Sequence, residues 1–255
     1  AAAYNEAYFK DYGYAVERQA YTVANMTFYN VIAEVRGSSR PEEIIIIGAH
    51  YDTFPGSPGA DDNGSGIAAL LVLARLFSGN VLERTLRFAA FVNEEPPFFW
   101  TRSMGSYVYA LRCREQGENI RAMLSLESIG YYSDKPKTQH YLFPLGLFYP
   151  RTGNFIAFVS NLMSRNLLRH CVGVFRNNVA MPVQAAAFPW FVPGVFWSDH
   201  WPFWKVGYPA IMVTDTALFR NPNYHTPEDR PETLDYHRMA QTVNGLDQVI
   251  RHLAL

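Results

Sequence analysis

The side chains that could do chemistry in this sequence gather just after its most apolar segments. His50 and Asp52 follow the isoleucine run 44–47, and two adjacent aspartates stand in the glycine-rich loop 59–66. Other acidic or imidazole side chains in comparable positions are Glu94, Glu95, Glu127, Asp215 and His225. One histidine or aspartate at a strand end most often caps the backbone, but several at successive strand ends favour a cation site. Imidazole and carboxylate ligands without a neighbouring cysteine suit zinc, cobalt or manganese.

Strands and helices are predicted to alternate along the chain, which would bring these residues together. The expected strands are 26–35, 43–47, 85–92, 122–126 and 209–213, with a short strand at 139–143. The expected helices are 5–18, 66–77, 103–114, 154–170 and 234–253. Residues 188–204 and the loop 221–233 are expected to be irregular.

This alternation predicts an α/β fold, a three-layer α/β/α domain with a mostly parallel, mixed central sheet. The whole chain, residues 1–255, would form one domain, with 1–22 as a helical lead-in. In such sheets ligands bind at the carboxyl ends of the strands. The loops that carry the acidic side chains, including the acidic loop 59–66, would lie there.

The composition is that of a globular protein, with 49% hydrophobic residues, 18% charged residues and a net charge of -1. Since no basic block supplies the electrostatic attraction that nucleic acids and anionic membranes require, neither is an expected partner. Cys113 and Cys171 stand outside any CxxC pair. They are expected to be free buried thiols, with a bond between them as the alternative. No stretch reaches the roughly 18 apolar residues of a membrane helix, and no signal-peptide pattern is present.

Six short motifs, taken in order, resemble peptidase family M28, a family of zinc metallopeptidases whose co-catalytic members are two-zinc aminopeptidases. The motifs are 50–52 (HYD), 59–66 (GADDNGSG), 93–95 (NEE), 126–130 (LESIG), 198–200 (SDH) and 224–229 (YHTPED). The resemblance runs from about residue 25 to the C-terminus. It implies a zinc exopeptidase-like fold, peptide substrates with a free N-terminus and removal of the N-terminal residue. It alone also implies a secreted or periplasmic location.

The resemblance further implies a ligand set for two zinc ions. His50 and Glu127 would hold one ion, Glu95 and His225 the other, and Asp61 would bridge them. The peptide bond between Asp61 and Asp62 resembles one that the family keeps cis.

The remaining roles that the resemblance implies surround the metals. Asp52 would orient the His50 imidazole from behind, and Glu94 would be the general base that passes a proton from the attacking water to the leaving amine. Other residues expected around the metals or the substrate are Asp62, Asp199, His200 and Tyr224.

The pair Glu94 and Glu95 supports this division independently of the resemblance. Adjacent side chains in extended backbone point in opposite directions, so the two carboxylates cannot easily share one role. One can bind metal while the other faces the substrate. Two metals about 3.5–4 Å apart also need a bridging carboxylate between them.

Several interpretations stay open at this point. Many family members have aspartate where this chain has Glu127, and the extra methylene changes the reach of the ligand. Asp199 and His200 could contact the substrate amine or be structural, and Tyr224 could polarise the scissile carbonyl or only pack. The aromatic segments 188–197 and 98–100 could wall a pocket for an apolar N-terminal side chain, or form core.

Two other functions stay open as well. A related single-zinc glutaminyl cyclase would share His50, the Gly-Ala-Asp stretch 59–61, Asp199 and His200. The complete loop 59–66 and the 93–95 triplet favour a peptidase. A catalytically inactive binding domain would keep the fold but would have no need of Glu94. The sequence contains no HExxH motif, no P-loop and no GxSxG elbow.

Overall fold

The isoleucine run forms the middle of a central strand, β3 (Arg40–His50), in the computed structural model, which describes residues 1–189 and 191–255. Ile44 and Ile46 pack into the core on one face of the sheet, and Ile45 and Ile47 pack into the core on the other. Because side chains alternate along a strand, a strand with helices on both faces must be apolar at every position. This explains why four consecutive isoleucines occur here.

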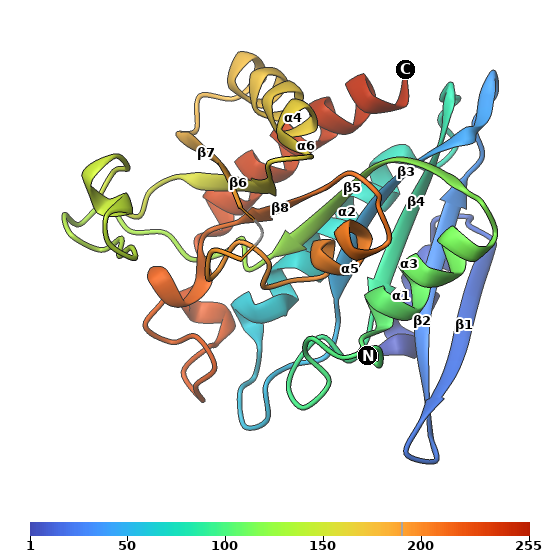
Figure 1. Ribbon diagram of the computed structural model, residues 1–255, viewed down its shortest axis with the longest axis horizontal. Helices are drawn as coiled ribbons and strands as arrows, with labels where there is room; N and C mark the ends of the chain where they lie inside the picture. The colour runs from blue at the N-terminus through green and yellow to red at the C-terminus, as the bar shows by residue number, and fades with distance from the viewer. Residues whose placement is uncertain (190) are drawn as a thin grey trace.

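Eight strands form one mixed sheet in the order β1-β2-β4-β3-β5-β8-β6-β7 (Figure 1). Its middle is the parallel group β4 (Arg84–Phe91), β3, β5 (Asn119–Glu127) and β8 (Ala210–Thr214). The other strands are β1 (Val16–Val23), β2 (Met26–Val35), β6 (Ile156–Asn161) and β7 (Val183–Phe188). The carboxyl ends of the four parallel strands therefore lie at one edge of the sheet.

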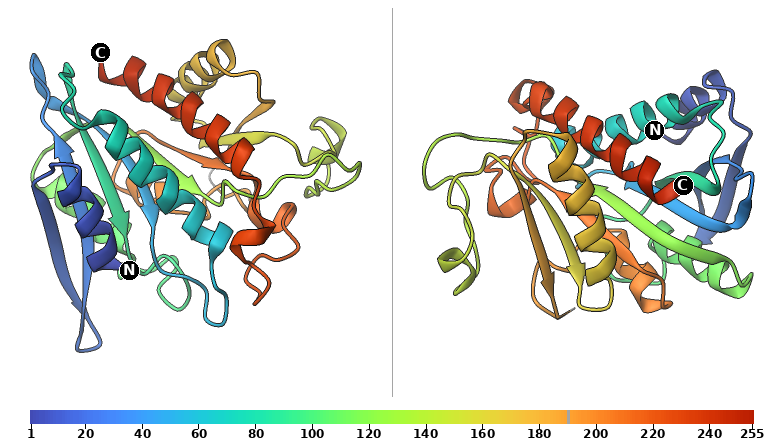
Figure 2. Two further views of the ribbon diagram at one scale, coloured as in Figure 1. Left: turned by 180° about the vertical axis from the view of Figure 1, so that it is seen from behind. Right: turned by 90° about the horizontal axis from the view of Figure 1, so that it is seen from above.

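Helices cover both faces, so the predicted three-layer α/β/α fold is confirmed. One face carries α1 (Ala2–Asp11), α2 (Gly66–Phe77), α4 (Arg165–Asn178) and α6 (Tyr236–Ala254) (Figure 2). The other carries α3 (Gly105–Glu115) and α5 (His200–Lys205) (Figure 1). Short helical turns occur at η1 (Ala60–Ser65), η2 (Leu145–Leu147), η3 (Ala217–Phe219) and η4 (Pro231–Thr233).

Two predicted helices are wrong in part. Residues 5–18, and with them the helical lead-in 1–22, divide into α1 and the edge strand β1, because β1 pairs along its whole length with β2. Residues 154–170 begin with β6, which lies between β8 and β7, and α4 starts only at Arg165. The short strand predicted at 139–143 is absent from the described residues, where that segment is irregular. Within the segment predicted to be irregular, α5 forms a helix.

The two cysteines are free and buried, as predicted. Cys113 packs into the core beneath α3 and Cys171 into the core on the opposite face, so the sheet separates them. Among the described residues, no helix combines the length and the apolarity needed to cross a bilayer.

Candidate metal centre

The sheet register brings three strand ends side by side. His50 is the last residue of β3 and lies opposite Phe91 at the end of β4, so Glu94 and Glu95 follow next to it. Glu127 is the last residue of β5, on the other side of β3. The prediction that these side chains meet at the carboxyl edge is therefore confirmed.

Two groups of metal-capable side chains form at this edge, and they share Asp62. In the first group, His50 Nε2 lies 3.2 Å from Asp62 Oδ1 and 3.3 Å from Glu127 Oε2. In the second, His225 Nε2 lies 2.9 Å from Asp62 Oδ2 and 3.3 Å from Glu95 Oε2. Within each group, one potential ligand atom per residue lies within 4.8 Å of the others.

The assignment of Asp61 as the bridging residue is wrong in this geometry. Asp61 Oδ1 accepts a hydrogen bond from the Gly130 N–H, and Oδ2 accepts one from Asn221 Nδ2, both at 2.8 Å. Both Asp61 oxygens therefore accept hydrogen bonds from residues outside the two groups, and it is Asp62 that lies between the two groups. The cis peptide bond is correspondingly one residue later, between Asp62 and Asn63.

Residues distant in sequence determine which of the two aspartates faces the cluster, the name used below for the two groups of metal-capable side chains together. The Asp229 carboxylate accepts hydrogen bonds from the backbone N–H groups of both Asp61 and Asp62. Asn63 donates to the Leu126 carbonyl and accepts from the Ser128 and Gly66 N–H groups. The acidic loop is therefore attached to the end of β5 and to the loop that carries His225.

Glu94 lies beside the first group without joining it. Its Oε2 is 3.9 Å from His50 Nε2, and the side chain is buried. Asp52 was predicted to orient His50, and its Oδ1 lies 3.7 Å from His50 Nδ1, while its backbone oxygen is closer, at 3.1 Å. The Asp52 carboxylate also accepts hydrogen bonds from the N–H groups of Glu94 and Glu95, which holds both glutamates against β3.

The crowded carboxylates perturb one another strongly. Burial raises the pKa of Glu94 well above its usual value and that of Glu127 to about 7. Burial alone would lower the pKa of His50, but the Glu127 and Glu94 carboxylates raise it well above its ordinary range. The pKa of His225 is likewise raised, to about 9, because Asp62 and Glu95 outweigh burial. These groups hold protons where a cation would otherwise balance the negative charge.

The His225 imidazole is held between two aromatic rings. The Phe54 ring stacks on one side at a centroid distance of 4.1 Å, and the Tyr224 ring stacks on the other at 3.8 Å. This contact gives Tyr224 a role in positioning His225 that the sequence did not indicate. Phe54 carried no signal in the sequence, because it stands in an ordinary loop outside the motifs.

Asp199 and His200 are both buried but differ in their contacts. The two carboxylate oxygens of Asp199 have no hydrogen-bond partner among the described residues, and burial raises its pKa to about 6. His200 Nε2 lies 2.8 Å from the Val195 carbonyl oxygen, and the ring edge packs on Trp204. His200 is therefore tied to the aromatic segment rather than to either group of ligands.

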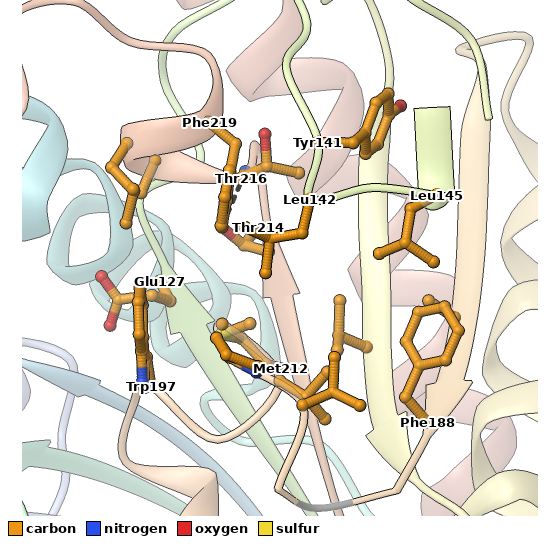
Figure 3. Close-up of a pocket in the computed structure, with 18 of the residues that line it drawn as sticks. Glu127, Tyr141, Leu142, Leu145, Phe188, Trp197, Met212, Thr214, Thr216 and Phe219 are labelled. Atoms are coloured by element: carbon orange, nitrogen blue, oxygen red, sulfur yellow. Dashed lines mark hydrogen bonds between the residues drawn. The ribbon is translucent and has the colours of Figure 1, made fainter. Parts of the chain in front are cut away.

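A cavity of about 120 Å³, open to solvent, adjoins the first group. Glu127 and Trp197 lie at one side of it, and Leu145 and Phe188 at the other (Figure 3). Its walls are mostly apolar, and part of the predicted segment 188–197 contributes to them: Phe188, Val192, Pro193, Gly194, Val195 and Trp197. Trp190 of that segment lies outside the described residues. A second hollow contains Glu94, Glu95, His225 and Phe99, and shares Glu127, Trp197, Leu218 and Tyr224 with the cavity.

Comparison with known proteins identifies the family. The model of peptidase family M28 matches residues 30–249. This chain belongs to peptidase family M28. It is 37% identical to the uncharacterized protein YfbL of Escherichia coli, over 96% of this chain and 77% of that protein. It is 27% identical to a protein of Saccharomyces cerevisiae named as a probable aminopeptidase, over 93% of this chain and 66% of that protein.

Solved structures of similar fold include a zinc aminopeptidase and a glutaminyl cyclase. LapB of Legionella pneumophila has a TM-score of 0.78 and 25% identity, over 100% of this chain and 65% of that chain. A zinc aminopeptidase of Bacillus subtilis has a TM-score of 0.69 and 22% identity, over 90% of this chain and 51% of that chain. The glutaminyl cyclase of Porphyromonas gingivalis has a TM-score of 0.73 and 18% identity, over 98% of this chain and 88% of that chain. This M28 chain thus spans about half to two thirds of the length of the proteins named here as aminopeptidases.

The residues present fit a metal of the kind found in a zinc aminopeptidase. Several buried ligand atoms of the cluster have no hydrogen-bond partner among the described residues: His50 Nε2, Asp62 Oδ1, Glu95 Oε1 and His225 Nε2. Buried polar atoms are rarely left unsatisfied in proteins, and bound cations supply the missing partner. The mixture of imidazole and carboxylate ligands matches zinc.

Proposed function

We propose that this M28 chain is a zinc-dependent aminopeptidase that removes an N-terminal residue with a large apolar side chain. The observation that supports it most strongly is the pair of ligand groups joined by Asp62, with Glu94 beside them. One zinc ion would bind to His50, Asp62 and Glu127, and a second to Asp62, Glu95 and His225. Zinc at this position would polarise the scissile carbonyl and make water more acidic.

Glu94 is the proposed general base. It is buried at the edge of the cluster, is 3.9 Å from His50 Nε2 and is not needed as a ligand in either group. A carboxylate at this place could take a proton from water and then release it to the leaving amine. Tyr224, whose burial raises its pKa, would stay protonated and could donate a hydrogen bond to the substrate.

Selection for a free N-terminus would come from the metal ligands in the hollow. Glu95 and Glu127, which would hold zinc, line the same hollow as Glu94. An α-amino group with a pKa of about 8 can lose its proton near neutral pH, and its nitrogen could then bind beside a zinc ion. An acetylated nitrogen is a poor ligand, so an acetylated peptide should be a poor substrate.

The adjoining cavity would take the side chain of the N-terminal residue. Its lining includes Val159, Phe188 and Met212, and about three additional carbons distinguish leucine from alanine. Burying them contributes about 2 kcal/mol, so kcat/KM should favour leucine over alanine by roughly thirtyfold.

A panel of aminoacyl anilides tests this proposal on zinc-loaded protein. Leucyl and phenylalanyl anilides should be cleaved fastest, N-acetyl-leucyl anilide should be inert and chelation should abolish turnover. Ala186 of β7 lines the cavity, so Ala186→Leu should lower kcat/KM for the phenylalanyl anilide and leave the alanyl anilide nearly unchanged. Equal loss on both anilides would argue against the cavity as the side-chain pocket.

Glutaminyl cyclisation is the second candidate, favoured by the likeness in fold to a solved cyclase. That likeness, at 18% identity, speaks to fold alone. A glutaminyl anilide in the same panel separates the two functions. A cyclase would convert it to the 5-oxoprolyl anilide with release of ammonia, whereas an aminopeptidase would release glutamine and the free aniline. A fully zinc-loaded protein that turns over neither class of substrate would favour a binding domain.

A further inference from the structure

An arm formed by residues 135–153 extends from the body of the molecule between β5 and β6 (Figures 1 and 2). Its two sides are joined near the base, where the Gln139 N–H donates to the Arg151 carbonyl. Near the tip, the Tyr141 hydroxyl donates to the Pro150 carbonyl at 2.6 Å. The arm therefore has defined internal contacts and presents its tip away from the sheet.

The tip is apolar and exposed. Phe143 is 90% exposed, Phe148 77% and Leu147 68%, and these three lie within six positions of one another. On the same arm, Tyr141, Leu142 and Leu145 point in the other direction and line the cavity beside the first group of metal-capable side chains. Isolated exposed apolar residues are common, but two phenylalanines and a leucine together at a projecting tip mark an interaction surface.

The charge of the arm indicates the partner. Residues 135–153 contain Lys135, Lys137, His140 and Arg151 but no aspartate or glutamate. Within the described part of the chain, neither lysine nor Arg151 forms an ion pair with a carboxylate. Lys137, His140 and Arg151 line one hollow, together with Gln139, Tyr141 and Gly146.

We propose that this arm docks the protein on an anionic phospholipid surface. Phe143, Leu147 and Phe148 would enter the boundary between head groups and acyl chains, and the basic hollow would contact lipid phosphates. Exposed aromatic and leucine side chains flanked by lysine and arginine have this affinity in general, since apolar burial and charge attraction add. The net charge of -1 for the whole chain conceals this local concentration of cations.

Co-sedimentation with vesicles tests the proposal on the intact chain. The protein should bind vesicles with about 30% phosphatidylglycerol at least tenfold more tightly than pure phosphatidylcholine vesicles. The double variant Phe143→Ser/Phe148→Ser should lose at least about tenfold in binding, because each ring contributes apolar burial. Lys137→Gln/Arg151→Gln should lose about tenfold on anionic vesicles only.

Matched controls use exposed residues elsewhere. Val81 is 85% exposed, and Arg165 and Arg169 are exposed residues of α4. Val81→Ser and Arg165→Gln/Arg169→Gln should bind vesicles like the parent chain. Circular dichroism should show unchanged melting for all variants, since the substituted side chains are exposed.

Three results would overturn the proposal. The first is no vesicle binding by the parent chain, and the second is binding that the two arm variants leave unchanged. The third is a concentration-dependent dimer that Phe143→Ser/Phe148→Ser disrupts while vesicles stay unbound, which would assign the tip to a second copy of the chain.

Inorganic phosphate serves as a further probe: binding of free phosphate without vesicle binding would make the hollow an anion site unrelated to lipid.

Discussion

Acidification should destabilise this protein through His200, and His200→Gln should remove that part of the pH dependence. The imidazole is fully buried, and its Nε2 lies 2.8 Å from the Val195 carbonyl oxygen, so Nε2 carries the proton and donates it. Nδ1 has no hydrogen-bond partner among the described residues. A second proton on Nδ1 would therefore be buried without an acceptor, and burial lowers the pKa of His200 from 6.5 to about 4.

The magnitude follows from the difference between the folded and unfolded pKa values. Since the folded value is the lower one, the unfolded chain binds the proton more tightly. The stabilisation is present above about pH 6.5 and is lost as the pH falls towards about 4. At about 1.4 kcal/mol per pH unit the complete loss is about 3 kcal/mol, and about 2 kcal/mol is lost by about pH 5.

Urea unfolding of the parent chain and of His200→Gln, with a chelator present, measures this loss. Glutamine keeps an N–H donor for the Val195 carbonyl but does not titrate. Other groups that titrate in this range, including Asp199, are common to both proteins and cancel in the difference.

The difference in free energy of unfolding between the parent and His200→Gln should shrink by about 2 kcal/mol from about pH 7.5 to about pH 5. A difference that stays constant over this range would refute the reasoning, because it would mean that folding does not perturb the titration of His200.

Three further predictions concern the proposed metal centre. Glu94→Gln should keep both zinc ions and lower kcat by about 10²–10⁴, as expected for a lost general base; near-normal turnover would contradict the assignment. Asp62→Asn should weaken zinc binding by at least about 100-fold in a competitive chelator titration, because Asp62 belongs to both ligand groups. Asp61→Asn, its matched control, should retain two zinc ions, since an amide oxygen can still accept from the Gly130 N–H; the reverse order of affinities would restore Asp61 as the bridge. Phe54→Ala should weaken the zinc ion held by His225 by about tenfold, and Phe54→Leu by less, because leucine still covers the imidazole face; equal affinity in all three proteins would show that stacking does not position the ring.

Strands buried on both faces and the helix after the acidic loop could be predicted from the sequence because their signals are local. The isoleucine run located β3, and 66–77 coincides with α2. Segment 154–170 failed because a short apolar run fits a strand or a helix equally well, and pairing with β8 and β7 decided the outcome. The edge strand β1 likewise depends on its partner β2 and not on its own pattern.

The residues of the candidate metal centre could be predicted better than the orientation of their side chains. His50, Glu95, Glu127 and His225 were identified from motifs and strand ends, and the structure brings them together. The choice between Asp61 and Asp62 was beyond the sequence, because hydrogen bonds from Gly130, Asn221 and Asp229 decide it. Each of these partners lies more than 60 positions away, so no local pattern could reveal which carboxylate faces the cluster.

The most direct test of the proposed function is a zinc titration of the metal-free chain, followed by release of leucine from a leucyl peptide, with a glutaminyl peptide assayed in parallel. We predict that leucine release rises until about two zinc ions are bound per chain, and that N-acetylation of the peptide abolishes it. Full activity with one zinc ion, together with conversion of the glutaminyl peptide to the 5-oxoprolyl peptide and release of ammonia, would contradict the proposal and assign this chain to the cyclases.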